Sequence, residues 1–247
     1  MTTLLAQVSD LHLDGGARAT RRAERVLEHL RSLPRPVDAV LVTGDIADHG
    51  EEDEYALAAE LLSGPFPVLT CPGNHDVRSA YRTALLGEAP GDGPVNRLHH
   101  VAGTAVLLCD SSVPGRDEGL LDAGTLRWIE QRLAELPGET RALLAFHHPP
   151  VVLHHPLPDA IRLREPARLA ALLDAHPRIA AVLTGHAHTA AVSNFAGLPL
   201  VTAPAVTSTL RLPWEGGPPV DPDQPPGLAF HVLDDDGRLT THFRVLP

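Results

Sequence analysis

The sequence contains no lysine and only two cysteines, and each scarcity narrows the classes of protein that it can encode. All 20 basic residues are arginine, set against 31 acidic residues, and the formal net charge is -11. A chain this acidic repels the phosphate backbone of nucleic acids at long range, so we expect no nucleic-acid partner. The cysteines, Cys71 and Cys109, form no Cys-x-x-Cys pair, so no disulfide framework is expected.

Long apolar runs are also missing, and no secretory leader is expected. No stretch approaches the roughly 20 consecutive apolar residues that a membrane-spanning helix needs. The first residues, Met1-Thr2-Thr3, carry no basic region, and an apolar run over 3–8 follows at once. These features predict a cytoplasmic protein with no membrane partner. A length of 247 residues with 43% hydrophobic residues predicts a single globular domain over 1–247.

Short apolar runs alternate with helical periodicities along most of the chain. The runs predict buried strands at 3–8, 38–43, 67–71, 104–108, 141–146 and 179–183. Helices are predicted at 17–33, 51–63, 122–136 and 165–175. Further strands are expected at 189–195, 200–203, 229–233 and 239–245, the last two joined by a hairpin at Asp236-Gly237. This order predicts an α/β fold with helices on the faces of a sheet.

Two segments, 151–158 and 213–226, are rich in proline and irregular. Such composition is typical of surface loops. The alternative is that they form walls of a substrate pocket beside the edge of a sheet, and the role of 213–226 is left open.

Five of the predicted strands end in a polar residue able to bind a metal. These residues occur in Asp10-Leu11-His12, Gly44-Asp45, Gly73-Asn74-His75, Phe146-His147 and Gly185-His186-Ala187-His188. Each motif alone is typical of an ordinary turn. Because ligand sites of α/β proteins form at the carboxyl ends of strands, five such ends together predict one shared metal site.

The types of side chain narrow the choice of ion. Carboxylates, imidazoles and one amide, without thiolate, suit Mn, Fe, Zn or Co. Seven ligands are too many for one tetrahedral zinc, but they suit two ions that share a carboxylate. We therefore expect two divalent or mixed-valence metal ions.

In sequence order, these motifs resemble the calcineurin-like metallophosphoesterase family over residues 3–190. Within the family, the residues of these motifs are most similar to those of the class III cyclic-nucleotide phosphodiesterases. The similarity to this class lies in Asp10-Leu-His12, Thr43-Gly-Asp-Ile-Ala-Asp48, Pro72-Gly-Asn-His-Asp76 and His147-His-Pro-Pro150.

The resemblance implies a fold and a division of the ligands. The fold would be a four-layer α-β-β-α sandwich with two mixed sheets, in which residues 191–247 complete the second sheet and carry the proline-rich loop. One metal would be held by Asp10, His12 and His188, and the other by Asn74, His147 and His186. Asp45 would bridge the two ions, and a hydroxide bridging them would attack the phosphorus.

Two further residues are implied in catalysis. His75 would stabilise the phosphorane or protonate the leaving alkoxide, and Asp48 matches the family's partner for that histidine. We expect a dyad in which the Asp48 carboxylate orients the His75 imidazole. Asn74, His75 and His188 would also contact the substrate.

For the other polar residues of these motifs, and for two further pairs of histidines, the sequence predicts a role less directly. His148 is either a support for the metal ligands or a filler of the turn before Pro149. Asp76 either orients backbone at the site or caps a helix that starts at Val77. The pairs His99-His100 and His154-His155 are expected on the solvated surface.

The function predicted from these residues is hydrolysis of small phosphodiesters, with cyclic nucleotides such as 3',5'- or 2',3'-cAMP as substrates. A phosphomonoesterase or a glycerophosphodiester hydrolase on the same metal core stays open. A nuclease is disfavoured by the acidic charge. A non-catalytic protein-binding scaffold is disfavoured because every ligand is present. Relatives in this subfamily are often dimers, so the resemblance also implies a homodimer.

Overall fold

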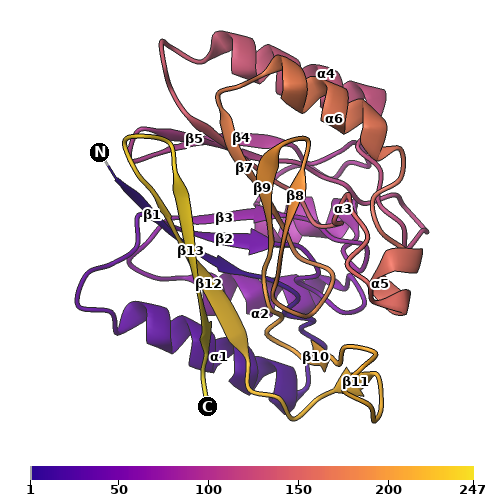
Figure 1. The fold of residues 1–247 in the computed structure, drawn as a ribbon. Coiled ribbons are helices and arrows are strands. Elements are labelled where there is room, and N and C mark those ends of the chain that lie inside the picture. The colour runs from indigo at the N-terminus through magenta and orange to yellow at the C-terminus, as the bar shows by residue number, and fades with distance from the viewer. Residues whose placement is uncertain (1) are drawn as a thin grey trace.

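A computed structural model describes residues 2–247 of the chain. Two large mixed sheets lie face to face, with helices on the outer face of each (Figure 1). None of the helices within 2–247 is long and apolar enough to cross a bilayer.

The first sheet has five strands in the order β13-β12-β1-β2-β3. β1 (Thr3–Val8), β2 (Ala39–Thr43) and β3 (Val68–Cys71) run parallel to one another. β12 (Gly227–Leu233) pairs antiparallel with β1, and β13 (Leu239–Val245) pairs antiparallel with β12. The helices α1 (Ala17–Arg31) and α2 (Glu52–Leu62) connect the three parallel strands.

The second sheet has six strands in the order β4-β5-β6-β7-β9-β8. Its parallel centre consists of β5 (Thr104–Leu108), β6 (Ala142–Ala145), β7 (Ile179–Thr184) and β9 (Leu198–Thr202). The antiparallel edges are β4 (Arg97–Val101) and β8 (Ala191–Phe195). The helices α4 (Ala123–Glu135) and α6 (Pro166–Ala175) cover its outer face.

The alternation of side chains along the strands divides the core into three layers. Ala6 and Val8 of β1 pack with α1 and α2, whereas Leu5 belongs to the layer between the sheets. In β6, Leu144 faces α4 and α6 while Leu143 faces the other sheet. Successive side chains of a strand point to opposite faces, so strands buried on both sides read as continuous apolar runs. The expected α/β four-layer sandwich is therefore confirmed.

The central layer holds one buried polar chain of hydrogen bonds. Gln7 of β1 donates to Thr43 Oγ1 (2.9 Å) and to the carbonyl of Thr184 (3.0 Å). Its Oε1 lies 2.9 Å from Nε2 of His231, whose Nδ1 lies 2.9 Å from Thr241 Oγ1. These contacts bind β1, β2, β7 and β12 together just before the strands end.

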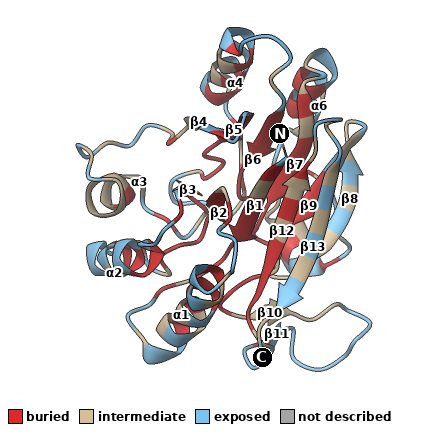
Figure 2. Cartoon of the chain, turned by 90° about the vertical axis from the view of Figure 1, so that its left-hand side faces the viewer, coloured by how far each residue is buried: buried red, intermediate tan, exposed pale blue. Residues whose placement is uncertain are grey.

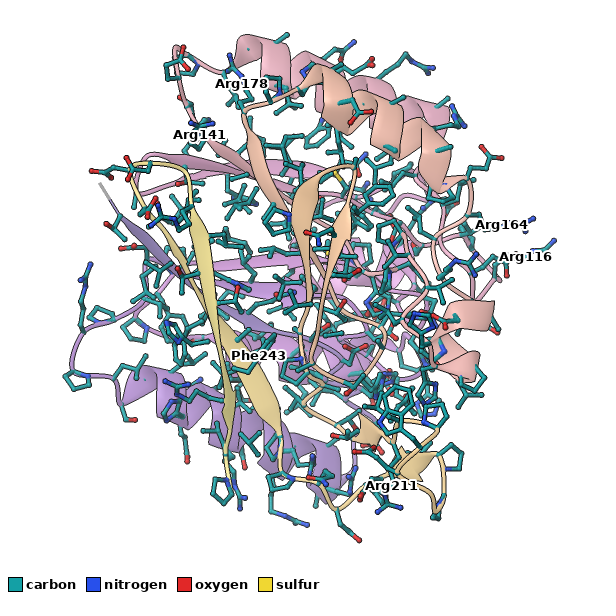
Figure 3. The ribbon with its side chains drawn as sticks, in the orientation of Figure 1. Arg116, Arg141, Arg164, Arg178, Arg211 and Phe243 are labelled. Atoms are coloured by element: carbon teal, nitrogen blue, oxygen red, sulfur yellow. The ribbon has the colours of Figure 1, made fainter. Side chains whose placement is uncertain are left out.

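One expectation about the sheets is wrong in part. Only β8 and β9 of residues 191–247 complete the second sheet, because β12 and β13 join the first sheet through β1. Both edge strands β8 and β13 show exposed surface (Figure 2). Phe243 of β13 packs against the layer between the sheets (Figure 3).

Several short elements were not predicted. They are β4, α3 (Arg78–Ala80) with the π-helical turn η1 (Tyr81–Leu85), α5 (Pro156–Ala160), and the paired strands β10 (Thr209–Leu210) and β11 (Val220–Asp221). The proline-rich segment 213–226 contains β11, and its residues 213–220 are exposed, with Trp214 at 70%. Arg211 pairs with Asp221 across the base of this segment (Figure 3).

Candidate metal centre

The five polar motifs meet at the carboxyl ends of β1, β2, β3, β6 and β7. Backbone hydrogen bonds join their turns to one another. The amide of Asp10 donates to the carbonyl of Gly44 (3.1 Å), and the amide of His12 donates to that of Asp45 (3.0 Å). The amide of Gly185 donates to the carbonyl of His147 (3.0 Å). The turns from both sheets therefore form one rigid frame.

The backbone at these turns is strained. Nine non-glycine residues of the described chain have a positive φ, and five of them are candidate ligands. These five are Asp10 (φ 55°), His12 (43°), Asp45 (49°), His186 (70°) and His188 (51°). The left-handed region costs L-residues about 1 kcal/mol or more each, and such strain concentrates at functional sites. Each residue leaves its strand abruptly, which turns its side chain into the common centre.

Glycine permits the close approach of two of these turns. Gly44 has a φ of +90°, and a Cβ placed there would lie 2.4 Å from Nδ1 of His147. A Cβ on Gly73 would lie 2.2 Å from Oδ1 of Asp45. Side chains at either position would displace a candidate ligand.

Three histidines present the same ring nitrogen to the centre. Nδ1 of His147 lies 2.7 Å from the carbonyl of Thr43, and Nδ1 of His188 lies 3.2 Å from the carbonyl of Ser208. Nδ1 of His12 lies 2.7 Å from the carboxylate of Asp48. Because these outer groups accept a hydrogen bond from a protonated Nδ1, each neutral imidazole has its lone pair on Nε2, which faces the centre.

The inward nitrogens surround two buried carboxylates. Nε2 of His147 lies 3.1 Å from Oδ2 of Asp45, and Nε2 of His12 lies 3.5 Å from the same oxygen. Nε2 of His188 lies 3.4 Å from Oδ1 of Asp10 and 3.2 Å from Nε2 of His12. Asp45 is therefore the carboxylate shared by the two halves of the cluster.

Backbone amides fix the orientation of both carboxylates. The amide of His75 donates to Oδ1 of Asp45 (2.9 Å). The amide of His186 lies within 3.1 Å and 3.2 Å of the two oxygens of Asp10. These donors stabilise negative charge inside the protein.

Burial and proximity shift the acidities of the cluster in opposite directions. Burial raises the pKa of Asp45, but the adjacent His147 outweighs it and holds that pKa well below its usual value. Burial also opposes a charged His147, yet Asp45 raises the pKa of this imidazole to about 9. For His186, burial and the neighbouring imidazoles of His148 and His147 lower the pKa well below its usual value.

Two buried donor atoms of the candidate ligands have no hydrogen-bond partner. Within residues 2–247, Oδ1 of Asn74 and Nε2 of His186 are buried without a hydrogen-bond partner. Buried polar atoms are rarely left without a partner, and each such group calls for an explanation. An ion beside Asn74 and His186 supplies one. Ligand atoms of Asp10, His12 and His188 lie within 4.8 Å of one another, as do those of Asp10, Asp45 and His147. The residues therefore fit a metal centre.

The expected Asp48–His75 dyad differs from the observed contacts. The Asp48 carboxylate bonds with His12 (2.7 Å) and lies 3.6 Å from Nδ1 of His75. Nδ1 of His75 instead donates to the backbone carbonyl of Asp48 (2.8 Å). The side chain of Asp48 turns toward the metal cluster, and its contact with the His75 ring is the longer one, so the carboxylate-oriented His75 stays a prediction. The hydrogen bond to His12 lowers the pKa of Asp48.

The structure decides between the alternatives for two neighbours. Nε2 of His148 donates to the carbonyl of Asp117 (3.1 Å), and its Nδ1 accepts from Ser111 Oγ (2.8 Å). Both nitrogens are occupied, so His148 supports the loop that contains Asp117. The Asp76 carboxylate accepts hydrogen bonds from Gly73, Ala47 and Ile46 amides and from Tyr55, and so orients backbone rather than capping a helix.

Two surface predictions fail. His155 is buried, because its ring bridges the amide of Leu157 and the carbonyl of Arg211. His99 is half-buried and lies with His100 in strand β4 rather than in a loop. His154 and His100 are exposed as expected. Ser208, which orients His188, was not predicted because a backbone acceptor leaves no signal in the sequence.

Comparison with known proteins identifies the fold and the family. The model of the calcineurin-like phosphoesterase family matches residues 3–190. A protein of Rhodococcus erythropolis named as a probable cyclic nucleotide phosphodiesterase is 35% identical over 94% of this chain and 80% of its own. A glycerophosphodiester phosphodiesterase of Enterobacter lignolyticus is 30% identical over 92% of this chain and 86% of its own.

A solved structure shares the arrangement of the chain. The dimetal phosphatase from Danio rerio superposes with a TM-score of 0.73 over 99% of this chain and 96% of its own, at 16% identity. Members of this family use dinuclear metal centres, which agrees with the clustered histidines and aspartates. The chain belongs to the calcineurin-like phosphoesterase family.

Proposed function

We propose that this protein is a dinuclear metal-dependent phosphodiesterase that hydrolyses small phosphodiesters, with cyclic nucleotides such as 3',5'- or 2',3'-cAMP as the leading class. The observation that carries the proposal is the set of three inward Nε2 atoms around Asp10 and Asp45, beside the unpartnered amide oxygen of Asn74. The relatives that act on cyclic nucleotides and on glycerophosphodiesters by name support a diester substrate.

The ligands divide between two ions in this proposal. Asp10, His12 and His188 would hold one metal, whereas Asn74, His147 and His186 would hold the other. Asp45 would be shared by the two, since its Oδ2 lies within 3.5 Å of Nε2 of both His12 and His147. The oxygen and nitrogen donors suit Mn, Fe, Zn or Co. Bound ions would neutralise charge on the phosphate oxygens and acidify a water molecule.

The protein side chains contribute binding and proton transfer. Asn74 and His188 border the position of the phosphate, and His75 projects beside them with a side chain that is 40% exposed. Because Nδ1 of His75 donates to the Asp48 carbonyl, its Nε2 is the nitrogen that reaches substrate. In this role His75 protonates the departing alkoxide or hydrogen-bonds the phosphoryl oxygens.

A glycerophosphodiester hydrolase is the second candidate, because a relative of that name is 30% identical over most of both chains. A phosphomonoesterase on the same metal core is the third. The homodimer, the single-domain organisation and the cytoplasmic location stay predictions.

The decisive assay compares a diester with a monoester on the same protein. Enzyme stripped by a chelator and reloaded with Mn²⁺ is given bis(p-nitrophenyl) phosphate or p-nitrophenyl phosphate. We expect metal-dependent turnover of the diester, lost in Asn74→Ala, whose side chain supplies a proposed ligand. A clear preference for the monoester would replace the proposed function with that of a phosphatase. Metal binding without turnover of either substrate would contradict both the phosphodiesterase and the phosphatase function.

A further inference from the structure

A cavity of about 400 Å³ adjoins the metal centre through Asn74. Its walls come from the segment 76–78, which follows the Asn74-His75 turn, and from the loop 112–115 after β5. The residues that line it include Asn74, Val77, Arg78, Asp92 and Val113. The cavity is large enough for a small-molecule ligand.

The charged groups on the floor of this cavity are already paired. The Arg78 guanidinium donates to the Asp110 carboxylate (2.8 Å), to the carbonyl of Asp92 (2.9 Å) and to the carbonyl of Ser112 (2.8 Å). Asp110 also accepts from Ser112 Oγ (2.6 Å). A guanidinium held by three partners is not oriented to bind a second phosphate. The cavity therefore suits a neutral group.

Apolar side chains make up another part of the lining. Val77 is 48% exposed, and Val113 and Pro114 come from the loop 112–115. Two apolar walls with one exposed carboxylate, Asp92, at the margin suit a flat ring system that bears hydrogen-bond donors.

The loop 111–119 that forms one wall is held firmly. His148 binds the carbonyl of Asp117 and the hydroxyl of Ser111, and a Cβ on Gly119 would lie 2.3 Å from the His148 ring. The amide of Arg164 donates to the carbonyl of Gly119 (2.8 Å). The Arg164 and Arg116 side chains project from the same rim and both pair with Glu118 (Figure 3). A preformed wall lowers the entropic cost of binding.

From these contacts we infer that the cavity beside Asn74 binds the nucleoside part of a diester substrate, between Val77 and Val113. The inference rests on the proposed function and deepens it, because it selects nucleotides over glycerol-based diesters. A glycerol unit is too small and too polar to cover both valines, whereas a nucleobase with its ribose covers them.

A binding experiment tests the cavity without catalysis. Adenosine, which carries no phosphate, is added to the protein as purified, and binding is followed by saturation-transfer difference NMR. We expect a signal on the base protons that is lost in Val77→Trp, because the indole fills the cavity. Val245→Trp introduces the same side chain at an exposed position of β13 and should leave the signal intact. Val113→Trp, from the opposite wall, replaces Val77→Trp if the latter does not fold.

A kinetic experiment compares two substrates on the same variants. In either tryptophan variant of the cavity, kcat/KM for 3',5'-cAMP should fall at least tenfold more than kcat/KM for glycerophosphoethanolamine. Equal losses on both substrates, or no adenosine signal in the unmodified protein, would overturn the inference. Adenosine binding that depends on Val77, in a protein that hydrolyses no diester, would instead overturn the proposed function and leave the cavity assignment standing.

Discussion

At the scale of single residues, the roles of His75 and Asp48 separate. The two residues share a backbone hydrogen bond, but the Asp48 carboxylate hydrogen-bonds the candidate ligand His12, whereas the His75 ring only packs edge-on against it, with 4.5 Å between the ring centroids. Substitutions should therefore change different properties of the enzyme.

For His75→Ala we expect the loss of proton donation with the metal content unchanged. Turnover of a diester with an alkoxide leaving group should fall about 100-fold or more, the lower end of the usual contribution of a general acid. Turnover of bis(p-nitrophenyl) phosphate should fall much less, because p-nitrophenolate leaves without a proton. Steady-state rates on both substrates measure the difference, and equal losses would show that His75 acts on phosphate binding instead.

For Asp48→Asn we expect weaker metal binding. The Asp48 carboxylate orients His12 and increases the basicity of its Nε2, so the exchange should lower metal affinity about 10- to 100-fold. Titration of the stripped protein with Mn²⁺ measures this affinity. An unchanged affinity, together with the leaving-group dependence of His75→Ala, would show that Asp48 acts through His75 and not through His12.

At the scale of the elements, the turn after β2 is the most sensitive. Gly44 and Gly103 have nearly equal φ values, +90° and +89°, but only Gly44 has neighbours within 4 Å of an added Cβ. Gly103→Ala should cost about 1–2 kcal/mol of unfolding free energy from backbone strain alone.

Gly44→Ala should lower the free energy of unfolding by roughly 1–3 kcal/mol more than Gly103→Ala does. It should also abolish metal-dependent turnover, because the methyl group displaces His147. Urea denaturation and diesterase assays on the matched pair measure both effects. Equal stability and activity of the two variants would contradict the close packing described around Gly44.

The elements also show what the sequence could and could not predict. Strands buried on both faces, such as β2 and β6, were predicted because every residue in them except the terminal Thr43 of β2 is apolar. β4 was missed because Arg97, His99 and His100 occupy an edge strand, where polar side chains are tolerated. The partners of Asp48 and the burial of His155 depend on side-chain directions and distant contacts, which spacing along the chain does not record.

At the scale of the whole molecule, the buried polar chain between the sheets makes stability depend on pH. Burial lowers the pKa of His231 to about 3, below the ordinary value of 6.5. The unfolded chain therefore binds more protons between these two values, and unfolding free energy falls as the pH falls through 6.5 toward 3.

Well below pH 6.5, His231 should lower the free energy of unfolding by about 1.4 kcal/mol for each further pH unit of acidification. His231→Gln removes this titrating group but keeps a polar side chain beside Gln7. The urea midpoints of the metal-stripped parent and of metal-stripped His231→Gln are compared at about pH 7.5 and about pH 5. The other histidines are the same in the two proteins, so their contribution cancels. The variant should lose less stability than the parent on acidification, and parallel losses would contradict a neutral, buried His231.

The architecture of two sheets explains why seven ligands reach one centre. Four ligands follow strands of the first sheet, namely Asp10, His12, Asp45 and Asn74, whereas His147, His186 and His188 follow strands of the second. Neither sheet alone supplies the proposed ligand set of either ion, so the centre depends on the packing of both.

The most direct test of the dinuclear centre is the number of metal ions per chain, measured by elemental analysis and native mass spectrometry after reloading with Mn²⁺. We predict two ions in the unmodified protein, and fewer than two in both Asn74→Ala and Asp45→Ala, with the larger loss when the bridging Asp45 is removed. One ion per chain in the unmodified protein, or two ions retained in Asp45→Ala, would contradict the account.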